Sequence, residues 1–179
     1  IPFICAVFNA LGEIKDSRSV ELISKFADNP NDRIRWSVAN SLGKLGDVQG
    51  MPALIKLLQD NLADIRQVTV EALGLLGDAQ AVPELDKILL NDKDIRVREL
   101  AAIALGKIKA PIALNSLLGA LSDVDEKVRR VAWNSILIIT ADKIDLMEEI
   151  AVKLYDTKQV TYALEIYRKI VDNSNFNFN

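Results

Sequence analysis

The chain has 179 residues, of which 50% are apolar and 26% charged, and its net charge at neutral pH is −3. This length corresponds to one domain, or to one domain with a short appendage, and the composition is typical of folded proteins. The small net charge does not favour a nucleic-acid or membrane partner. Because the sequence contains no histidine, His-dependent acid–base catalysis and His-ligated metal centres are excluded for this chain.

The sequence also bears on cellular location. Its single cysteine, Cys5, cannot form an internal disulfide, which fits a reducing, cytoplasmic compartment. No apolar run approaches the roughly 18 residues that predict a transmembrane helix, so we expect no membrane association. A chain that begins with Ile1 rather than Met is consistent with a piece of a longer protein.

A Leu-Gly pair recurs at nearly constant spacing. It stands at Leu11-Gly12, Leu42-Gly43, Leu73-Gly74 and Leu105-Gly106, which gives intervals of 31, 31 and 32 residues. An apolar residue followed by arginine stands eight residues before each of the last three Leu-Gly pairs. The same marker stands eight residues before Ile136-Leu137, where leucine replaces the glycine. These markers are Ile34-Arg35, Ile65-Arg66, Val97-Arg98 and Val128-Arg129. Several markers that share one period indicate internal repeats.

Each repeat is predicted to form two helices. First helices are expected over residues 51–58 and 82–89, with Pro52 and Pro83 in the first turn. Second helices are expected to begin near Arg33, Ile65, Arg96 and Lys127, because apolar residues follow at spacings of three and four. The expected N-caps are Asp32, Asp64, Asp94 and Asp125, and the expected left-handed C-caps are Gly46 and Gly77. The other repeats place Gly-Asp after the second helix, at Gly46-Asp47 and Gly77-Asp78. The third repeat has Lys109-Ala110-Pro111 there, so a different turn geometry is expected.

The glycine of each Leu-Gly pair falls inside a second helix, where it costs about 1 kcal/mol relative to alanine. Its recurrence at Gly43, Gly74 and Gly106 predicts close approach of a neighbouring helix, which we take to be a first helix. A single hairpin cannot bury its apolar face, so stacked hairpins must share a core. We therefore predict an all-α fold, an α-solenoid (superhelix) of about four and a half antiparallel hairpins over residues 1–141. It would be curved, with the second helices on the concave side.

The period breaks after residue 141. We expect a C-terminal helical cap over residues 142–172, with Asp142 as a helix N-cap, because the last repeat of a solenoid needs a polar outer face. The Asn-rich segment 173–179 is expected to be a flexible tail.

The repeated pattern resembles a known family. The order apolar-Arg, small residues, Leu-Gly, Gly-Asp and Pro-x-Leu is similar to the short HEAT repeat named after phycobilisome lyases. The segments 34–54 and 65–85 match it almost fully, and the resemblance covers roughly residues 1–141. It implies an armadillo-like helical solenoid and says little about function, because such repeats serve many roles.

The sequence offers no catalytic, cofactor-binding or metal-binding residues. It has no phosphate-binding loop and no Cys/His cluster, and paired carboxylates such as Glu148-Glu149 fit solvated helix faces. The recurrent arginines, Arg35, Arg66, Arg98 and Arg129, either form a structural ladder or bind an anion. Recurrent turn aspartates in adjoining repeats, Asp16, Asp47 and Asp78, favour the ladder. The third repeat lacks this aspartate, so Arg129 is expected to have a different or weaker partner.

Positions that vary between repeats are the candidates for recognition. On the second helices they predict a partner-binding concave face made of Arg33, Trp36, Ser37, Asn40, Gln67, Val68, Glu71, Arg96, Glu99, Leu100, Ile103, Lys127, Arg130, Val131 and Asn134. The outward positions of these helices together carry six basic and six acidic residues, which disfavours nucleic acid. Trp36 is the expected hot spot for a partner protein, whereas Trp133 is expected to fill the core. Leu75 and Ile138 are either exposed or core.

Three functions remain open. The first is a non-catalytic scaffold that binds another protein, alone or as a module of a larger protein. The second, implied by the resemblance, is a phycobilin lyase or chaperone-like subunit that holds a bilin. The third, which the neutral face disfavours, is nucleic-acid binding. The oligomeric state is left open.

Overall fold

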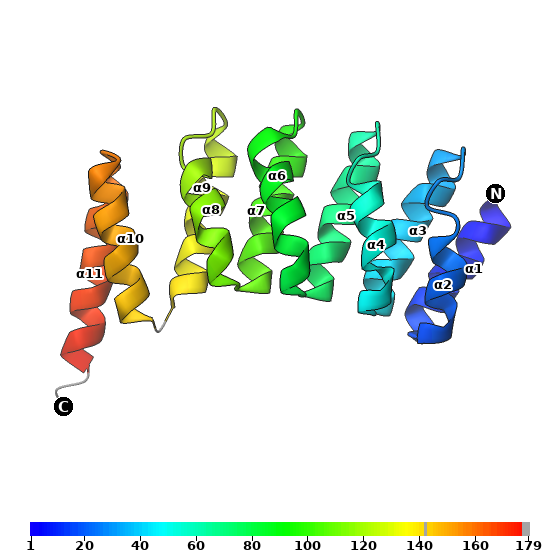
Figure 1. Cartoon of the computed structure of the whole chain (residues 1–179), viewed down its shortest axis with the longest axis horizontal. Coiled ribbons are helices and arrows are strands. Elements are labelled where there is room, and N and C mark those ends of the chain that lie inside the picture. Colours follow the sequence, from blue (N-terminus) through cyan, green and yellow to red (C-terminus); the bar gives the residue numbers. More distant parts are fainter. Residues whose placement is uncertain (142, 177–179) are drawn as a thin grey trace. The chain divides into compact units, whose positions relative to one another are not determined.

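Helices make up the regular structure of the residues that can be described (Figure 1). The computed structural model describes the backbone of residues 1–141 and 143–176, and the side chains of that range as far as residue 171. The chain divides into two compact units, Ile1–Ile136 and Leu137–Asn179, which we call the N-terminal and C-terminal units. The expected N-cap Asp142 and residues 177–179 of the expected tail lie outside the described residues. The domain boundaries after 141 and 172 stay predictions.

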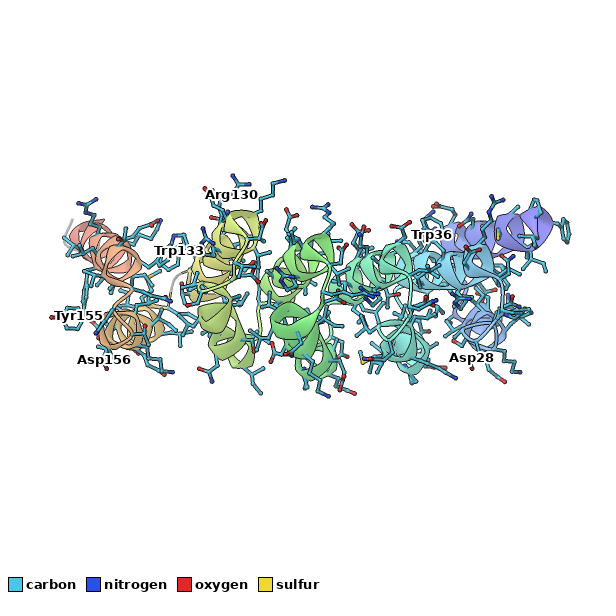
Figure 2. All side chains as sticks on the ribbon, turned by 90° about the horizontal axis from the view of Figure 1, so that it is seen from above. Asp28, Trp36, Arg130, Trp133, Tyr155 and Asp156 are labelled. Atoms are coloured by element: carbon cyan, nitrogen blue, oxygen red, sulfur yellow. The ribbon has the colours of Figure 1, made fainter. Side chains whose placement is uncertain are left out.

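The N-terminal unit is a stack of helical hairpins in sequence order. The second helices of the repeats are α1 (Pro2–Ile14), α3 (Asp32–Leu45), α5 (Ala63–Leu76), α7 (Ile95–Ile108) and α9 (Glu126–Thr140), the last of which runs into the C-terminal unit. The first helices are α2 (Val20–Ser24), α4 (Met51–Leu57), α6 (Val82–Asn91) and α8 (Leu114–Ala120). Figure 2 shows first and second helices as two layers. The prediction of an all-α solenoid is confirmed.

A single turn of 3₁₀-helix precedes each first helix. These turns are η1 (Ser17–Ser19), η2 (Val48–Gly50), η3 (Ala79–Ala81) and η4 (Pro111–Ala113). The side chains of Asp16, Asp47 and Asp78 cap the first three by accepting a hydrogen bond from the backbone N–H two residues later, and Ala110 stands at this position in the fourth. The turn aspartates of the repeat are therefore occupied by local capping.

The N-caps of the second helices are only partly those that the sequence predicts. Asp94 and Asp125 accept hydrogen bonds from backbone N–H groups of the first turn, as expected. In α3, however, the cap is Asn31, whose side chain accepts from two backbone N–H groups, and Asp32 is the first helical residue. In α5, Asp64 also lies inside the helix, and Leu62 occupies the cap position without a side-chain hydrogen bond. The cap predictions for Asp32 and Asp64 are therefore wrong by one and two positions.

The second helices α1, α3, α5 and α7 each end in a left-handed residue. Gly46 and Gly77 adopt positive φ angles of 66° and 70°, which confirms them as C-caps. The third repeat keeps the same geometry, because Lys109 takes a φ of 55° there. The expectation of a different turn is wrong, since a lysine tolerates the conformation at a modest cost.

Glycine sets the spacing between consecutive second helices. A Cβ atom on Gly43 would lie 2.7 Å from the Cβ of Ala72 in α5, and one on Gly74 would lie 3.0 Å from the Cβ of Ala104 in α7. Contacts between consecutive second helices are also far more extensive than those between consecutive first helices in this unit. The close neighbour of each glycine is thus the second helix of the next repeat, which corrects the expectation of a first helix.

Replacing Gly43 by alanine is expected to destabilise the fold by about 1–2 kcal/mol, because overpacking against Ala72 outweighs the higher helix propensity of alanine. Urea unfolding followed by circular dichroism measures the change. Gly119→Ala is the matched control, because its new Cβ would meet only Leu90 at an ordinary 3.4 Å. Adding Ala72→Gly should not recover the loss, because the new Cβ would still lie 2.8 Å from the Cα atom of residue 72. Equal losses of stability in Gly43→Ala and Gly119→Ala would contradict the close approach of α3 and α5 at Gly43.

The C-terminal unit contains the helices α10 (Ile144–Asp156) and α11 (Val160–Phe176), which pack against each other. Their buried side chains are Met147, Ile150, Ala151, Leu154, Ala163 and Ile166. Lys158, in the turn between them, has a positive φ of 62°.

Candidate partner-binding surface

The recurrent arginines form a ladder along the N-terminal unit, but with other carboxylates than the sequence predicts. The Nε atoms of Arg35, Arg66 and Arg98 donate to Asp60, Asp92 and Asp123 over 2.6, 2.6 and 2.7 Å, and Nη2 of each binds the second carboxylate oxygen. Each aspartate lies in the loop between the two helices of the next repeat. Nη1 of each arginine donates to a backbone carbonyl of the loop before its own helix. Every rung therefore joins two consecutive loops.

Charge pairing within the ladder shifts the acidity of its carboxyl groups. The Arg98 guanidinium holds the pKa of Asp123 below its usual value. Burial raises the pKa of Asp60 and Asp92, but the hydrogen bonds and charges of Arg35 and Arg66, together with backbone N–H donors in the same loops, outweigh it and leave both values lowered. Because carboxylates and carbonyls already accept the hydrogen bonds of these guanidinium groups, the structure supports a structural ladder and not an anion-binding site.

Arg129 stands at the end of the ladder. Its Nη1 donates to the backbone carbonyls of Asp123 and Val124 over 2.7 and 3.1 Å. No carboxylate pairs with it among the residues that the structure describes. Arg129 thus keeps the carbonyl contacts that the other three arginines also make and has the weaker pairing that was expected, but the missing turn aspartate is not the reason, because turn aspartates pair with none of the ladder arginines.

Most residues of the predicted face are accessible. Figure 2 shows Trp36 and Arg130 on the side of the second helices, opposite Asp28 on the side of the first helices. The exposed members are Arg33, Trp36, Glu71, Arg96, Lys127, Arg130 and Asn134, and the half-buried ones are Asn40, Gln67, Glu99, Ile103 and Val131. Trp36 is 41% exposed and Trp133 is buried, as expected. Leu75 and Ile138 are exposed and so do not belong to the core.

Three predicted face residues are buried instead. Ser37, Val68 and Leu100 all lie three residues after the apolar anchor of their second helix. This position faces the preceding second helix: the Ser37 hydroxyl donates to the carbonyl of Cys5 in α1 over 3.3 Å. The expectation that these three side chains are open to a partner is therefore wrong, because close packing between second helices covers them.

Polar side chains on the accessible face are largely paired with one another. The Asn40 amide donates to Asn9 across α1 and α3 over 3.0 Å, and Lys44 pairs with Glu13 over 2.7 Å. Within α7, Arg96 pairs with Glu99 over 2.9 Å. These pairs do not include Asp32, Arg33 or Asp64, which are the charged residues nearest to Trp36.

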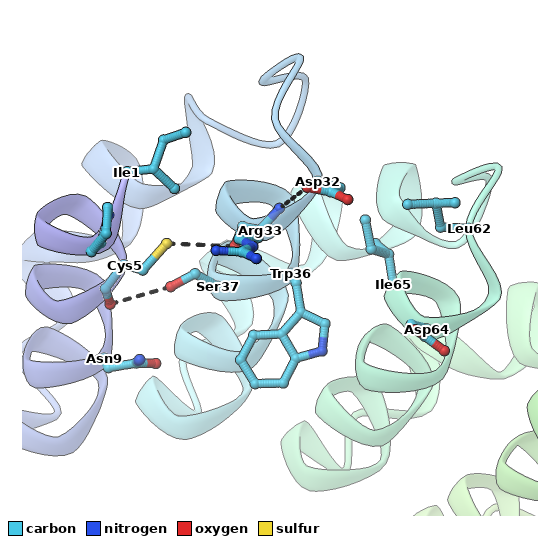
Figure 3. A pocket seen from close by; sticks show the side chains of 11 residues that line it. Ile1, Cys5, Asn9, Asp32, Arg33, Trp36, Ser37, Leu62, Asp64 and Ile65 are labelled. Carbon is cyan, nitrogen blue, oxygen red and sulfur yellow. Dashed lines mark hydrogen bonds between the residues drawn. The ribbon is translucent and has the colours of Figure 1, made fainter.

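A pocket of about 390 Å³ opens beside Trp36. It lies at the N-terminal ends of three consecutive second helices and is lined by Ile1, Pro2, Cys5, Asn9, Asp32, Arg33, Trp36, Ser37, Leu62, Asp64 and Ile65. Figure 3 shows the Trp36 indole between residues of α1, such as Asn9, and residues of α5, such as Asp64. The Cys5 thiol is half-buried here and contacts the carbonyl of Arg33 at 3.6 Å. The walls of the pocket are mainly apolar, and its charged groups are Asp32, Arg33 and Asp64.

Leu62 is one of several pocket residues that lie outside the predicted face, which includes only Arg33, Trp36 and Ser37 of the lining. It occupies the N-cap position of α5, where other repeats place Asn31 or Asp94, and it is exposed. A helix normally gains about 1 kcal/mol from a polar cap, so an exposed leucine there is a departure from the repeat. Comparing the cap positions between repeats could have found it.

Within the described range, no three Cys, Asp or Glu side chains gather in a way that could hold a metal ion. None of the described helices is both long and apolar enough to cross a membrane.

The sequence pattern of HEAT repeats matches residues 5–73 and 51–136, which together span most of the chain. The chain belongs to the HEAT-repeat family. A search of curated proteins gives no match. The HEAT assignment agrees with the resemblance read from the Leu-Gly and apolar-Arg markers.

Solved structures with the same fold include both natural and designed repeat proteins. A chain of the CpcE–CpcF complex of phycocyanin lyase from Nostoc sp. PCC7120 is 22% identical, with a TM-score of 0.66 over 83% of this chain and 64% of that one. An engineered protein is 20% identical, with a TM-score of 0.62 over 93% and 90% of the two chains. A designed armadillo repeat protein in complex with the peptide (KR)4 is 17% identical, with a TM-score of 0.61 over 91% of each chain. This HEAT chain therefore spans about two thirds of the lyase chain, and these likenesses establish the fold alone.

Proposed function

We propose that this HEAT-type array is a non-catalytic scaffold that binds a partner protein on the accessible face of its second helices. The observation that carries the proposal is the apolar pocket beside Trp36. Tryptophan anchors that bury on binding contribute more than most other contacts at interfaces. A concave, mainly apolar site with a few polar groups at its rim is the usual form of a binding site.

The chemistry of the pocket indicates what it can accept. Trp36, Leu62 and Ile65 offer apolar contact, whereas Asp32 and Asp64 place negative charge at the rim against the single positive charge of Arg33. An apolar side chain flanked by a basic group fits this arrangement best. The designed armadillo protein of the same fold, which is in complex with the peptide (KR)4, supports peptide recognition by such a scaffold.

Trp36→Ala is expected to weaken partner binding by about 2 kcal/mol or more, roughly thirtyfold in Kd, because the variant loses the anchor of the pocket. The partner is captured on the immobilised chain, identified by mass spectrometry, and titrated against both forms by calorimetry. Leu22→Ala is the control, because Leu22 is also an exposed apolar residue but lies on α2, in the other layer. Unchanged affinity for a folded Trp36→Ala variant would refute the assignment of the pocket.

A second candidate is a subunit of a phycobilin lyase. It is favoured by the likeness to the CpcE–CpcF complex and by the resemblance of the Leu-Gly and apolar-Arg markers to lyase-type repeats. The distinguishing experiment mixes the chain with a free bilin and an apo-phycobiliprotein and follows the visible absorption spectrum. A spectral change that depends on the chain would favour the lyase, and an unchanged spectrum favours the scaffold.

A further inference from the structure

Three residues of the Trp36 pocket differ from their counterparts in the other repeats. Counted from the apolar residue that precedes each ladder arginine, Trp36 lies two positions after it, Asp64 one position before and Leu62 three positions before. The counterparts are polar or charged at the first position, basic at the second and helix caps at the third. They are, in this order, Gln67, Glu99 and Arg130; Arg33, Arg96 and Lys127; and Asn31, Asp94 and Asp125. Stacking does not require the three departures, because the other second helices stack without them.

A second pocket in the N-terminal unit shows what the usual residues form. It has a volume of about 460 Å³ and lies at the N-terminal ends of α7 and α9. Two of its carboxylates, Asp94 and Asp125, are engaged as caps that accept hydrogen bonds from first-turn N–H groups. Arg96 and Lys127 stand there at the position of Asp64. The usual residues thus form a polar pocket that is basic where the Trp36 pocket is acidic.

The Asp64 carboxylate is free to bind a ligand. Asp64 is exposed, and no described residue donates a hydrogen bond to its carboxylate or pairs with it. The other acidic residue of the pocket, Asp32, already accepts a hydrogen bond from the Arg33 backbone N–H over 2.7 Å. The two carboxylates outnumber the one basic group, Arg33, so the pocket carries net negative charge. Figure 3 shows Asp64 on the α5 side of the Trp36 indole, whose face also attracts cations.

We propose that Asp64 is the specificity-determining residue of this pocket, and that it selects a partner segment in which lysine or arginine neighbours an apolar residue. The proposal rests on the proposed function, because it concerns the same pocket. The apolar side chain packs against Trp36 and Leu62, and the cationic group pairs with Asp64. The counterparts of Asp64 are basic and would repel such a segment, so one repeat among similar ones is marked as the docking point.

Selection from a random peptide library tests the proposal without knowledge of the partner. Heptapeptides displayed on phage are bound to the immobilised chain, and those that also bind Trp36→Ala are discarded. The remaining peptides should carry lysine or arginine adjacent to an apolar residue or one residue away from it. In fluorescence anisotropy, replacing that basic residue by glutamate should weaken binding about fivefold or more, because an attraction becomes a repulsion.

The outcomes separate this inference from the proposed function. Trp36-dependent peptides that lack a basic residue near the apolar one would overturn the role of Asp64 and leave the scaffold function standing. A selection that yields no Trp36-dependent peptide would refute the proposed function, and this inference with it.

Asp64→Arg is the decisive variant, because the other repeats carry a basic residue at this position and the fold tolerates it. It should reverse the preference, so that the glutamate peptide binds about fivefold more tightly than the original one. A loss of folding cannot produce such a reversal. Glu148→Arg, the same charge change at an exposed residue of α10, should keep the preference for the basic peptide. An unchanged preference in Asp64→Arg would overturn the proposal.

Leu62→Asn tests the apolar half of the site. It gives α5 the cap residue that α3 already has in Asn31, so the urea midpoint should rise. Binding of the selected peptide should nevertheless weaken about threefold, because an apolar contact is lost. A purely structural residue would move stability and affinity in the same direction. An unchanged affinity would remove Leu62 from the site and overturn the apolar contact proposed for it.

Discussion

Replacing Arg66 by alanine is expected to lower the free energy of unfolding by about 3–5 kcal/mol, the cost of breaking a buried ion pair from one side. Arg66 is buried, and its guanidinium binds both oxygens of Asp92 at 2.6 and 2.8 Å and the carbonyl of Asp60 at 2.9 Å. Removing it leaves the buried Asp92 carboxylate without its counter-charge and separates two consecutive loops. Urea unfolding with linear extrapolation measures the loss.

Arg129→Ala is the matched control for this rung. Arg129 occupies the same register and bonds to loop carbonyls, but it has no carboxylate partner in the described part of the chain. Its replacement should cost only about 1–2 kcal/mol, the range for hydrogen bonds from a charged donor. If Arg66→Ala and Arg129→Ala lowered the free energy of unfolding by the same amount, the Asp92 carboxylate would not be the source of the stability.

The acid dependence of stability gives an independent readout of the same pair. Asp92 has a lowered pKa in the folded protein, so its contribution is present above the unfolded value near 3.8 and is lost as pH falls through the lower folded value. In Arg66→Ala, burial, which raises the pKa of Asp92, would be opposed only by the hydrogen bond from the Asp94 backbone N–H and by the charge of Lys93, so this pKa would lie higher than in the wild type. The decline of stability at acid pH should therefore be shallower in the variant than in the wild type.

The period of the sequence was sufficient to predict the fold. Leu-Gly pairs, apolar-Arg pairs and turn glycines each report local geometry, and one shared spacing of 31 or 32 residues leaves stacking as the way to bury the apolar faces. The caps were harder to assign, because Asn31 and Asp32 are adjacent and both can accept backbone hydrogen bonds. Only the dihedral angles of the helix start decide between them.

The partners of the arginine ladder show why a correct motif can be given the wrong acceptor. The repeats that contain α3 and α5 offer aspartates in two loops, at opposite ends of the second helix. Side chains of a helix tilt toward its N-terminus, so Arg66, in the first turn of α5, reaches Asp92. The turn aspartate Asp78 follows the other end of the 14-residue helix, about 20 Å away. The direction of the side chain, which spacing alone does not give, decides the pairing.

The candidate surface was predicted with an error of one helical position. Trp36 and Ser37 are neighbours in sequence, yet the first is exposed and the second buried. The boundary between them depends on the rotation of α3 that brings Gly43 against Ala72, a contact between repeats that no single repeat encodes. Leu62 was missed for a related reason, since it lies at the end of a loop, where helical periodicity carries no information.

Leu54→Ala is expected to lower the free energy of unfolding by about 2–5 kcal/mol, because it removes buried methyl groups and leaves a cavity in a packed layer. Leu54 in α4 is fully buried, and Leu85 occupies the same position in α6, one repeat later. Because repeats in a solenoid contact only their neighbours, Leu85→Ala should cost a similar amount. Unfolding curves from tryptophan fluorescence and circular dichroism provide the two values.

Leu75→Ala separates the effect of the cavity from that of losing a leucine as such. Leu75 is on α5 and exposed, so its replacement should change stability by less than about 0.5 kcal/mol. A loss below about 1 kcal/mol at both Leu54 and Leu85 would mean that these residues do not fill the layer between first and second helices. The register that aligns all repeats, and with it the placement of Trp36 on the accessible face, would then be wrong.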